Sequence, residues 1–509
     1  MSETLYNGIC LPDEWPPRDI DRASKAPIPV PYLAHVPAVI PVGTGRQLFV
    51  DDFLIGSTDL ARVYHHPVKY SGNPVFRPET AAETETLPCA CPKSGGIWYD
   101  ADTKRFRMWY EAGWLNKLAY AESADGLHWE RPALDVVPGT NLILPGVEMD
   151  STAVFPDPDT KDPDAKFKLF VRGPGGLMPG RAYVSPDGVH WSDPVLTTPL
   201  EDRSTIFYNP FRKKWVYSIR RVFDKERIRL YRECDDYLKG ADWSDGSAVF
   251  WLRVDEADRP DPAIGMPPQL YNMDVVAYES IMLGMFQIHL GPENSVCRDT
   301  GIPKITELQA VYSRDGFHFS RPDRMAFIPA SRTKEAWDRG YVQSVGGLCH
   351  IRRDEIWFYY IGFQGDEGRT LPYGRLGGMH DHSATGLATL RRDGFASMEG
   401  TGTLQTRLIS AKDRNRLFVN ANTGGALLAE LQTADGKAVP GFTMADCVPF
   451  TGDRTLHRIR WRENELLPVA DGRPFRLRFQ LQTGALYAFW LSDTPAGDSH
   501  GMTAAGLVE

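Results

Sequence analysis

The sequence predicts an all-β protein in which a five-bladed β-propeller is followed by a C-terminal β-sandwich. Turn residues are abundant, with 46 Gly and 39 Pro among 509 residues. A hairpin phrase recurs between about residues 94 and 400, and regular apolar–polar alternation replaces it afterwards. Many short strands separated by Gly- and Pro-rich turns are typical of propellers and sandwiches.

The recurring phrase is Ser-x-Asp-Gly followed by an aromatic residue. It occurs at 123–129, 185–191 and 313–319, with weaker copies at 234–243 and 392–395. An Asp-Gly pair between two strand-like runs forms a tight turn, since Gly accepts a positive φ and Asp tolerates one. Each phrase follows a strand–turn–strand pattern, so each module is expected to be a four-stranded antiparallel blade. The five blades are predicted at 94–132, 150–194, 202–245, 277–322 and 343–395.

Two segments flank the predicted propeller. Residues 1–45 contain eight prolines and no periodicity, which indicates an extended arm, because Pro disfavours both helix interiors and central strands. After residue 400 the runs 427–432, 456–461, 475–481 and 486–491 largely alternate apolar and polar residues, as in a sandwich with one face in water. We therefore expect an arm at 1–45, a propeller at 46–399 and a sandwich at 400–509.

The net charge, the lengths of the apolar runs and the cysteine content argue against several classes of function and location. A net charge of −9 and a pI near 5.8 argue against non-specific nucleic-acid binding. No run of about 18 apolar residues exists, so no membrane-spanning helix is expected. Seven scattered cysteines and a start without a signal-peptide pattern favour reduced thiols and a cytoplasmic location, with an exported protein that has lost its leader as the alternative. The sequence leaves a homo-oligomer open.

Three acidic residues stand beside apolar, strand-like runs. Asp150 precedes 151–155, Asp202 precedes 203–208, and Glu279 lies near the start of 277–286. A charge beside such a run is costly to bury unless it is paired or has a function. If these runs are the inner strands of successive blades, the three carboxylates converge at the propeller axis.

Converging carboxylates predict cleavage of a glycosidic bond. That reaction needs one carboxylic acid to protonate the leaving oxygen and a second carboxylate that attacks or activates water. Glu279 has the most apolar surroundings, which raise a carboxyl pKa, and is the expected acid. Asp150 is the expected nucleophile or base, and Asp202 the expected stabiliser of positive charge or ligand of sugar hydroxyls. The alternative is that each acid caps a strand or pairs with an arginine.

Further residues are candidates for sugar binding, because aromatic rings stack on sugar faces and long polar side chains reach hydroxyls. Asp51 and Asp52 are included because the predicted first blade has no acid on its inner strand; a turn or an edge-strand charge is their alternative role. No cofactor is expected, and no metal, since His380-Asp381-His382 alone falls short of three or four converging ligands. The remaining candidates are Lys93, Trp114, Arg203, Tyr278, His289, Trp337, Tyr341, Gln343 and His380.

The predicted architecture and the order Asp150, Asp202, Glu279 resemble the five-bladed propeller glycosidases of families 32, 43, 62, 68 and 130, over about residues 45–509. The C-terminal sandwich is most similar to that of family 32. The family-32 motifs Trp-Met-Asn-Asp-Pro-Asn-Gly, Arg-Asp-Pro and Glu-Cys do not stand at the matching places; the Glu-Cys at 233–234 falls near a blade's outer turn. The resemblance implies a glycosidase, expected to be exo-acting on a furanoside or a short oligosaccharide.

Three alternatives stay open. A phosphorylase similar to family 130 would hold phosphate with Lys93, Arg203, Arg220 and Arg221. A lyase would use Tyr or His on a uronic acid. A non-catalytic propeller would bind a sugar or dock a protein, because one fold hosts many functions.

Overall fold

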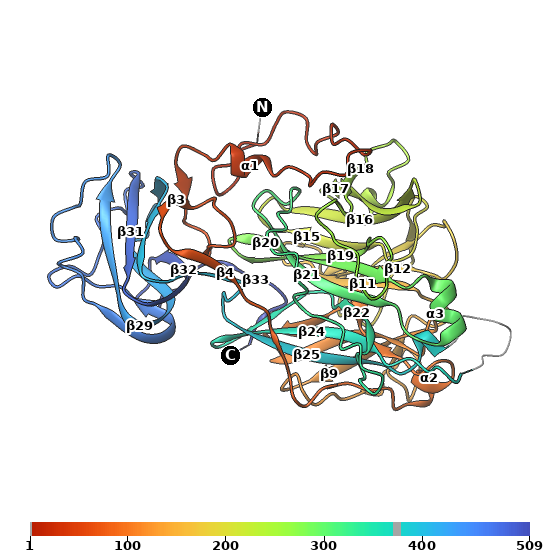
Figure 1. The fold of residues 1–509 in the computed structure, drawn as a ribbon. Helices are drawn as coiled ribbons and strands as arrows, with labels where there is room; N and C mark the ends of the chain where they lie inside the picture. Colours follow the sequence, from red (N-terminus) through yellow and green to blue (C-terminus); the bar gives the residue numbers. More distant parts are fainter. Residues whose placement is uncertain (1–2, 370–377, 509) are drawn as a thin grey trace.

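The computed structural model describes residues 3–369 and 378–508. Five mainly antiparallel sheets form the blades of a propeller, and an eleven-stranded sheet forms a second body beside it (Figure 1). The helices are short: α1 (Pro31–Ala34), α2 (Ala81–Thr84) and α3 (Asn294–Thr300). The predicted fold class is confirmed.

The first three blades follow the chain in order, each with its first strand innermost. Blade 1 comprises β6 (Ala90–Cys91), β7 (Ile97–Asp100), β8 (Arg105–Ala112), β9 (Lys117–Ser123) and β10 (Leu142–Ile143). Blade 2 comprises β11 (Ser151–Pro156), β12 (Phe167–Arg172), β13 (Arg181–Ser185) and β14 (Val195–Leu196). Blade 3 comprises β15 (Thr205–Asn209), β16 (Lys214–Phe223), β17 (Glu226–Cys234) and β18 (Val249–Leu252).

The last two blades include strands from the ends of the chain. Blade 4 comprises β19 (Gln269–Glu279), β20 (Ile281–Gly291), β21 (Ile305–Ser313) and the C-terminal β33 (Met502–Thr503). Blade 5 comprises β22 (Gly340–Ser344), β23 (His350–Arg352), β24 (Glu355–Phe363), β25 (Ser383–Arg391), the early β5 (Val68–Lys69) and the C-terminal β34 (Leu507–Val508). Segments far apart in sequence thus complete the propeller.

The repeated Ser-x-Asp-Gly phrase forms the same hydrogen-bonded turn in three blades. In the first, one oxygen of Asp125 accepts the backbone N–H groups of Leu127 and His128 at 2.8 Å, and the other lies 2.7 Å from His128 Nδ1. Asp187 and Asp315 repeat the contact with their own histidines at 2.7 Å. These histidines therefore stabilise the turns, as the repeat predicts.

Strand pairing moves the expected domain boundaries. The eleven-stranded sheet takes β1 (Ile40–Pro41), β2 (Gln47–Leu48), β3 (Ile55–Thr58) and β4 (Ala61–Tyr64) from the first part of the chain. The other members are β26 (Ala396–Glu399), β27 (Gly402–Thr406), β28 (Ile409–Ser410), β29 (Arg416–Thr433), β30 (Phe450–Arg458), β31 (Phe475–Leu481) and β32 (Gly484–Ser492). The sandwich thus contains residues on both sides of 45 and begins before 400, because local alternation identifies strands but not their partners.

Blade 4 begins earlier than predicted. The run 277–286, read as one strand, is a hairpin in which Tyr278 pairs with Ile281 and Glu279-Ser280 forms the turn. Glu279 adopts φ 49°, a conformation that Gly, Asn or Asp usually supplies in such turns. Without that signal the turn is invisible in the sequence. Glu279 therefore ends an inner strand instead of standing at its head.

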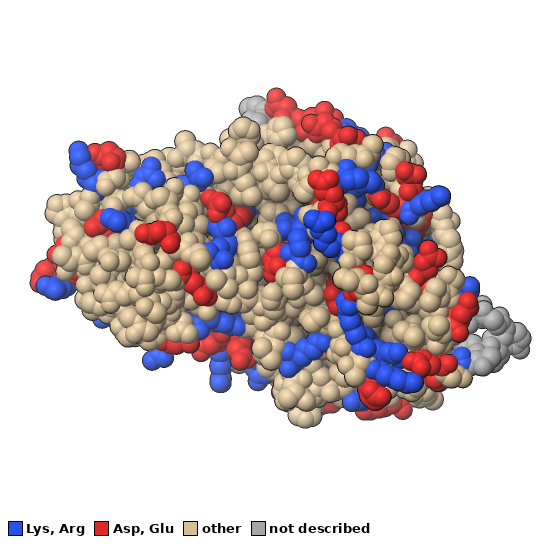
Figure 2. Space-filling view, in the orientation of Figure 1, with Lys and Arg blue, Asp and Glu red and all other residues tan. Residues whose placement is uncertain are grey.

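The N-terminal arm packs along the propeller. Tyr6 donates a hydrogen bond to the Ser280 carbonyl at 2.5 Å, and Trp15 packs edge-on against Phe317 with ring centroids 5.6 Å apart. Among the described residues, no helix is long and apolar enough to cross a lipid bilayer. On the face shown in Figure 2, basic and acidic residues are interspersed without a large field of one sign.

Candidate active site at the propeller axis

Polar side chains gather where the five inner strands begin. The residues at or beside these strand heads are Lys93, Asp150, Arg203, Tyr271 and Tyr341. Lys93 Nζ lies 3.3 Å from the Asp150 carbonyl oxygen. Arg229 links the next two strand heads, since its guanidinium donates to the carbonyls of Arg203 at 2.6 Å and Tyr271 at 2.7 Å. We call this end of the propeller the axial site.

Three of the strand heads have a left-handed backbone. Lys93, Arg203 and Tyr341 adopt φ values of 47°, 58° and 53°. This conformation is uncommon for residues other than Gly, Asn and Asp, and each instance costs on the order of 1–3 kcal/mol. Such strain persists where surrounding structure imposes it, and it concentrates at functional sites.

One side of the axial site is a buried cation against aromatic rings. Lys93 forms an ion pair with the buried Glu111, and its Nζ lies 4.2 Å from the ring centre of Trp114. Burial works against the ammonium charge, but Glu111 outweighs it and raises the Lys93 pKa. Trp114 stacks on His380 at 4.1 Å. Lys93, Trp114 and His380, all sequence-predicted, thus lie together.

A tyrosine pair forms the other side. The hydroxyls of Tyr271 and Tyr341 are hydrogen-bonded, and Lys304 Nζ lies 3.3 Å from the Tyr271 hydroxyl. Burial opposes ionisation of Tyr271, but Lys304 and the hydrogen bond from Tyr341 outweigh it and lower the Tyr271 pKa to about 8. Burial and the neighbouring Tyr271 raise the Tyr341 pKa well above its usual value. Two hydroxyls whose pKa values are shifted in opposite directions are suited to act as base and acid.

Several buried polar groups of the site have no hydrogen-bond partner among the described residues. They include all three guanidinium nitrogens of Arg203, both ring nitrogens of His289, both amide atoms of Gln343 and Nδ1 of His380. His289 lies beside the tyrosine pair, with its ring 5.9 Å from that of Tyr271. Buried polar groups in folded proteins are nearly all hydrogen-bonded, so unpaired ones at one site indicate a place for solvent or ligand.

Carboxylates at the rim are partly exposed. The Asp150 side chain is 16% exposed and lies 3.5 Å from Arg172. Asp202, 33% exposed, forms an ion pair with Arg220, which also pairs with Glu201 at 3.1 Å. Asp150 and Asp202 therefore both lie near strand heads, as predicted.

A pocket of about 440 Å³ opens beside the tyrosine pair. Its lining includes Arg227, Gln269 and His289. The Arg227 guanidinium carbon lies 5.6 Å from the ring centre of Tyr271, so the pocket borders that tyrosine. Its volume is large enough for a sugar unit, and none of the five strand-head residues named above lines it.

Glu279 lies at the other end of the propeller, so its predicted convergence with Asp150 and Asp202 is wrong. It is the last residue of β19, eight positions after Tyr271, and eight strand residues span about 26 Å. Its carboxylate is fully engaged there, accepting from the Arg46 backbone at 3.0 Å and from the Ser499 hydroxyl at 2.7 Å. The predicted sugar contact Tyr278 shares this place, where its hydroxyl donates to Asp393 at 2.8 Å.

Three more predicted sugar contacts lie outside the axial site. Asp51 is buried and held by the Arg314 guanidinium at 2.8–3.0 Å, whereas Asp52 is exposed and pairs with Arg62. Trp337 packs on Tyr360 in blade 5, with ring centroids 5.3 Å apart. Ion pairing accounts for both carboxylates and ring packing accounts for Trp337, without a ligand.

The sequence interpretation missed Tyr271, Lys304 and Glu111. Tyr271 follows the rule that located Asp150, a polar residue at the head of an inner strand, but the misplaced start of blade 4 hid it. Lys304 and Glu111 lie at the ends of the non-inner strands β21 and β8, for which no rule was available. Within residues 3–369 and 378–508, no three His, Cys, Asp or Glu side chains gather as a metal site.

Comparisons with solved structures return glycoside hydrolases, in line with the resemblance predicted from the sequence. The chain is similar to an endo-1,4-β-xylanase from Bacteroides thetaiotaomicron, with 10% identity, a TM-score of 0.39, and coverage of 62% of this chain and 96% of that one. It is also similar to the family-32 β-fructofuranosidase of Bombyx mori, with 11% identity, a TM-score of 0.34, and coverage of 87% of this chain and 94% of that one. For a family-117 glycoside hydrolase from Zobellia galactanivorans the identity is 10% and the TM-score 0.34, with coverage of 65% of this chain and 90% of that one. No protein-family model matches the chain, and no curated protein matches its sequence. At these identities and scores, no substrate or residue role carries over.

Proposed function

We propose that this protein cleaves a glycosidic bond of a carbohydrate at the axial site. The observation that carries the proposal is the hydrogen-bonded pair of tyrosine hydroxyls with Lys304 at 3.3 Å from one of them, together with the partly exposed Asp150 carboxylate at another inner-strand head. Acid and base groups with separated pKa values are what bond cleavage with proton transfer requires.

In hydrolysis, Asp150 is the base. Its carboxylate lies 3.5 Å from Arg172, and a water activated by the carboxylate attacks the anomeric carbon. The leaving oxygen takes its proton from a hydroxyl of the tyrosine pair. In this assignment the acid is a hydroxyl of the tyrosine pair and not the Glu279 carboxyl expected from the sequence.

Elimination is the second candidate, and the cations around the tyrosine pair favour it. If the sugar is a uronic acid, the Tyr271 phenolate removes the proton at C5 and a C4–C5 double bond forms. The bond from C4 to the glycosidic oxygen breaks, and that oxygen takes a proton from Tyr341. The hydrogen bond between the hydroxyls returns a proton from Tyr271 to Tyr341, which restores both groups.

The test is a panel of neutral and acidic oligosaccharides, followed for new reducing ends and for the ultraviolet absorbance of an unsaturated product. Hydrolysis gives reducing ends alone and falls about 10²–10⁴-fold in Asp150→Asn, as expected for loss of a general base. Elimination gives both signals and falls by a similar factor in Tyr271→Phe.

Asp323→Asn is the matched control, because Asp323 pairs with His66 at the surface, away from the axial site. It should leave both signals unchanged. Binding without cleavage across the panel would overturn the proposal and favour a non-catalytic propeller.

A further inference from the structure

The Arg203 side chain is a buried cation without a counter-charge. The residue is 2% exposed, and none of its guanidinium nitrogens has a hydrogen-bond partner or an ion pair among the described residues. It is the one arginine of the described chain with all three nitrogens buried and unpaired. Burying an unpaired charge is strongly unfavourable, so such a group indicates an anion that the protein itself does not supply.

Lys304, beside the tyrosine pair, is a second buried cation without a carboxylate partner among the described residues. It is 3% exposed, its Nζ lies 4.9 Å and 4.7 Å from the ring centres of Tyr271 and Tyr341, and no carboxylate of the described residues forms an ion pair with it. Lys304 Nζ lies 3.3 Å from the Tyr271 hydroxyl, and the Arg229 guanidinium joins the backbone carbonyls of Arg203 and Tyr271, so the two cations come from neighbouring strand heads. The charges of Lys304, Arg227 and Arg203 all favour the ionised form of Tyr271. The axial site thus carries excess positive charge inside a protein of net charge −9.

Most neighbouring charges are paired with one another. Lys93 is paired with Glu111, and Arg220 with both Asp202 and Glu201. The Arg229 guanidinium contacts carbonyl oxygens and the Asn272 amide, and the buried Asp274, which accepts from Asn272 at 2.9 Å, favours its charge. Arg203 and Lys304 remain without a carboxylate of the described residues. Burial together with Arg203 and Arg220 lowers the Arg229 pKa to about 9. The site therefore disfavours further positive charge and favours an anion.

We propose that Arg203 and Lys304 bind an oxyanion, and that this oxyanion is the carboxylate of an acidic sugar, a uronic acid. The inference rests on the proposed function and names its substrate class. A planar guanidinium fork matches a carboxylate through two parallel hydrogen bonds, and Lys304 adds a point charge. The unpaired polar atoms of His289 and Gln343 are available for the sugar hydroxyls. Inorganic phosphate is the other source of the same chemistry.

A bound carboxylate has a consequence for the tyrosine pair. It neutralises the cations that stabilise the Tyr271 phenolate, so the Tyr271 pKa rises from about 8 toward that of an ordinary tyrosine. Neutralising the carboxylate also acidifies the C5 proton of a uronate. Binding of an acidic sugar is therefore visible in the tyrosine ionisation even when no bond is cleaved.

The experiment measures binding by calorimetry with four probes: D-glucuronate, D-galacturonate, methyl glucoside and inorganic phosphate. At least one uronate should bind about tenfold or more tighter than methyl glucoside. In Arg203→Met that affinity should fall about 30-fold or more, as for truncation of one partner of a buried charge pair. Arg473→Met is the control, because Arg473 forms an exposed ion pair with Asp471 and has no place in the axial site. It should bind as the wild type does.

Lys304→Met serves as a second variant, with the same expected direction, if Arg203→Met does not fold. Equal affinity for uronates and methyl glucoside, or unchanged binding in both variants, would overturn the inference. Binding of phosphate without binding of uronates would also overturn it and favour a phosphorylase. Cleavage of neutral glycans with no uronate binding would refute the inference alone, whereas uronate binding without any cleavage would refute the proposed function alone.

Discussion

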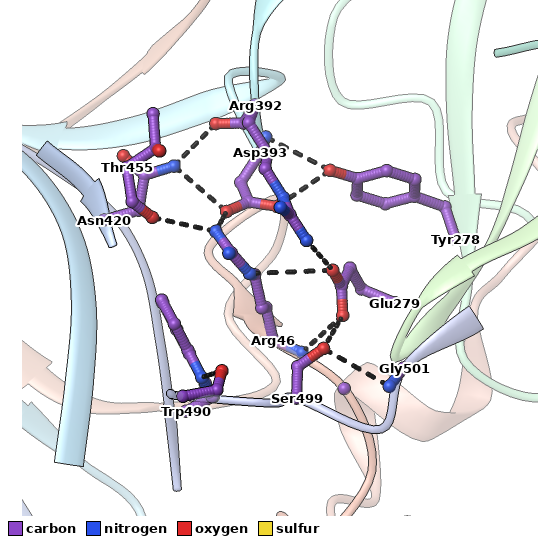
Figure 3. A network of polar contacts seen from close by, with 12 residues as sticks. Arg46, Tyr278, Glu279, Arg392, Asp393, Asn420, Thr455, Trp490, Ser499 and Gly501 are labelled. Atoms are coloured by element: carbon purple, nitrogen blue, oxygen red, sulfur yellow. Dashed lines mark hydrogen bonds and ion pairs between the residues drawn. The ribbon is translucent and has the colours of Figure 1, made fainter. Parts of the chain in front are cut away.

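Two buried clusters of charged residues lie at opposite ends of the propeller, and they differ in how completely positive and negative charges are paired. The first, which we call the interdomain network, combines Arg46 and Arg392 with Glu279 and Asp393 (Figure 3). Two cations face two anions, and Arg46 lies 2.7 Å from Asp393. The axial site instead leaves Arg203 and Lys304 without a carboxylate of the described residues. A charge whose partner is missing inside the protein indicates a ligand, whereas a charge that is matched indicates structure.

The position of the interdomain network explains why it is matched. Arg46 comes from the segment between the arm and β2, and it stacks on Trp490 of the sandwich at 4.0 Å. Glu279 ends an inner strand of the propeller, and Asp393 accepts a hydrogen bond from Asn420 of β29 at 3.0 Å. The network therefore joins the propeller to the sandwich.

The largest expected effect comes from making the same substitution in both clusters. Arg46→Met leaves Glu279 and Asp393 without their shared cation, and breaking a buried pair in this way costs about 3–5 kcal/mol. Arg203→Met removes an unpaired buried charge and should cost about 0–1 kcal/mol or even stabilise the protein. Urea unfolding measures both.

Asp435→Asn is the control, because Asp435 forms an exposed pair with Lys437, and this substitution should leave the urea midpoint close to that of the wild type. Equal losses for the two arginine variants would show that Arg203 is structural, and would break the comparison. A loss of cleavage in a fully folded Glu279→Gln variant would show that Glu279 has a role in the reaction, and would contradict the structural role given to the interdomain network.

A smaller expected difference between the two clusters is the pH at which their buried tyrosines ionise. Each holds a buried tyrosine, but Lys304 and Arg203 help to lower the Tyr271 pKa to about 8, while burial and the nearby Asp393 and Glu279 raise that of Tyr278 well above its usual value. Ultraviolet titration should therefore show one tyrosine ionising near pH 8, and Tyr271→Phe should remove that step. Tyr278→Phe should leave it in place.

The sign of the stability effect follows from the direction of the shift. The folded state lowers the Tyr271 pKa below the value of about 10 in the unfolded chain, so folding favours the phenolate. The stabilisation is complete above about pH 10 and is lost as the pH falls to about 8. An absence of any tyrosine ionisation near pH 8 would contradict the proposed base.

The sequence could predict the blades because their signals are local. Asp125 and its repeats form turns through contacts two and three residues away, and the apolar alternation of each strand is equally short-ranged. The same local rule placed Asp150, Asp202, Lys93 and Arg203 at strand heads. It failed at Glu279, where a left-handed non-Gly residue forms a turn that no short-range pattern marks.

Charge balance could not be predicted because it depends on distant partners. Arg46 meets Asp393 across 347 residues, and Arg314 meets Asp51 across 263. Nothing near Glu279 in the sequence distinguishes a matched carboxylate from a catalytic one. Lys304 and Tyr271 likewise meet through the folding of blade 4, so the excess positive charge exists only in three dimensions.

The smallest expected effect concerns Asp52, the sequence-based candidate for sugar binding that pairs at the surface. Its side chain is 74% exposed and contacts Arg62, so the pair contributes about 0–1 kcal/mol and is screened by salt. Asp52→Asn should therefore leave both the urea midpoint and the cleavage rate close to those of the wild type. A substantial rise in KM in this variant would extend the binding site to the sandwich side of the molecule, and would show that a matched surface charge can also serve the ligand.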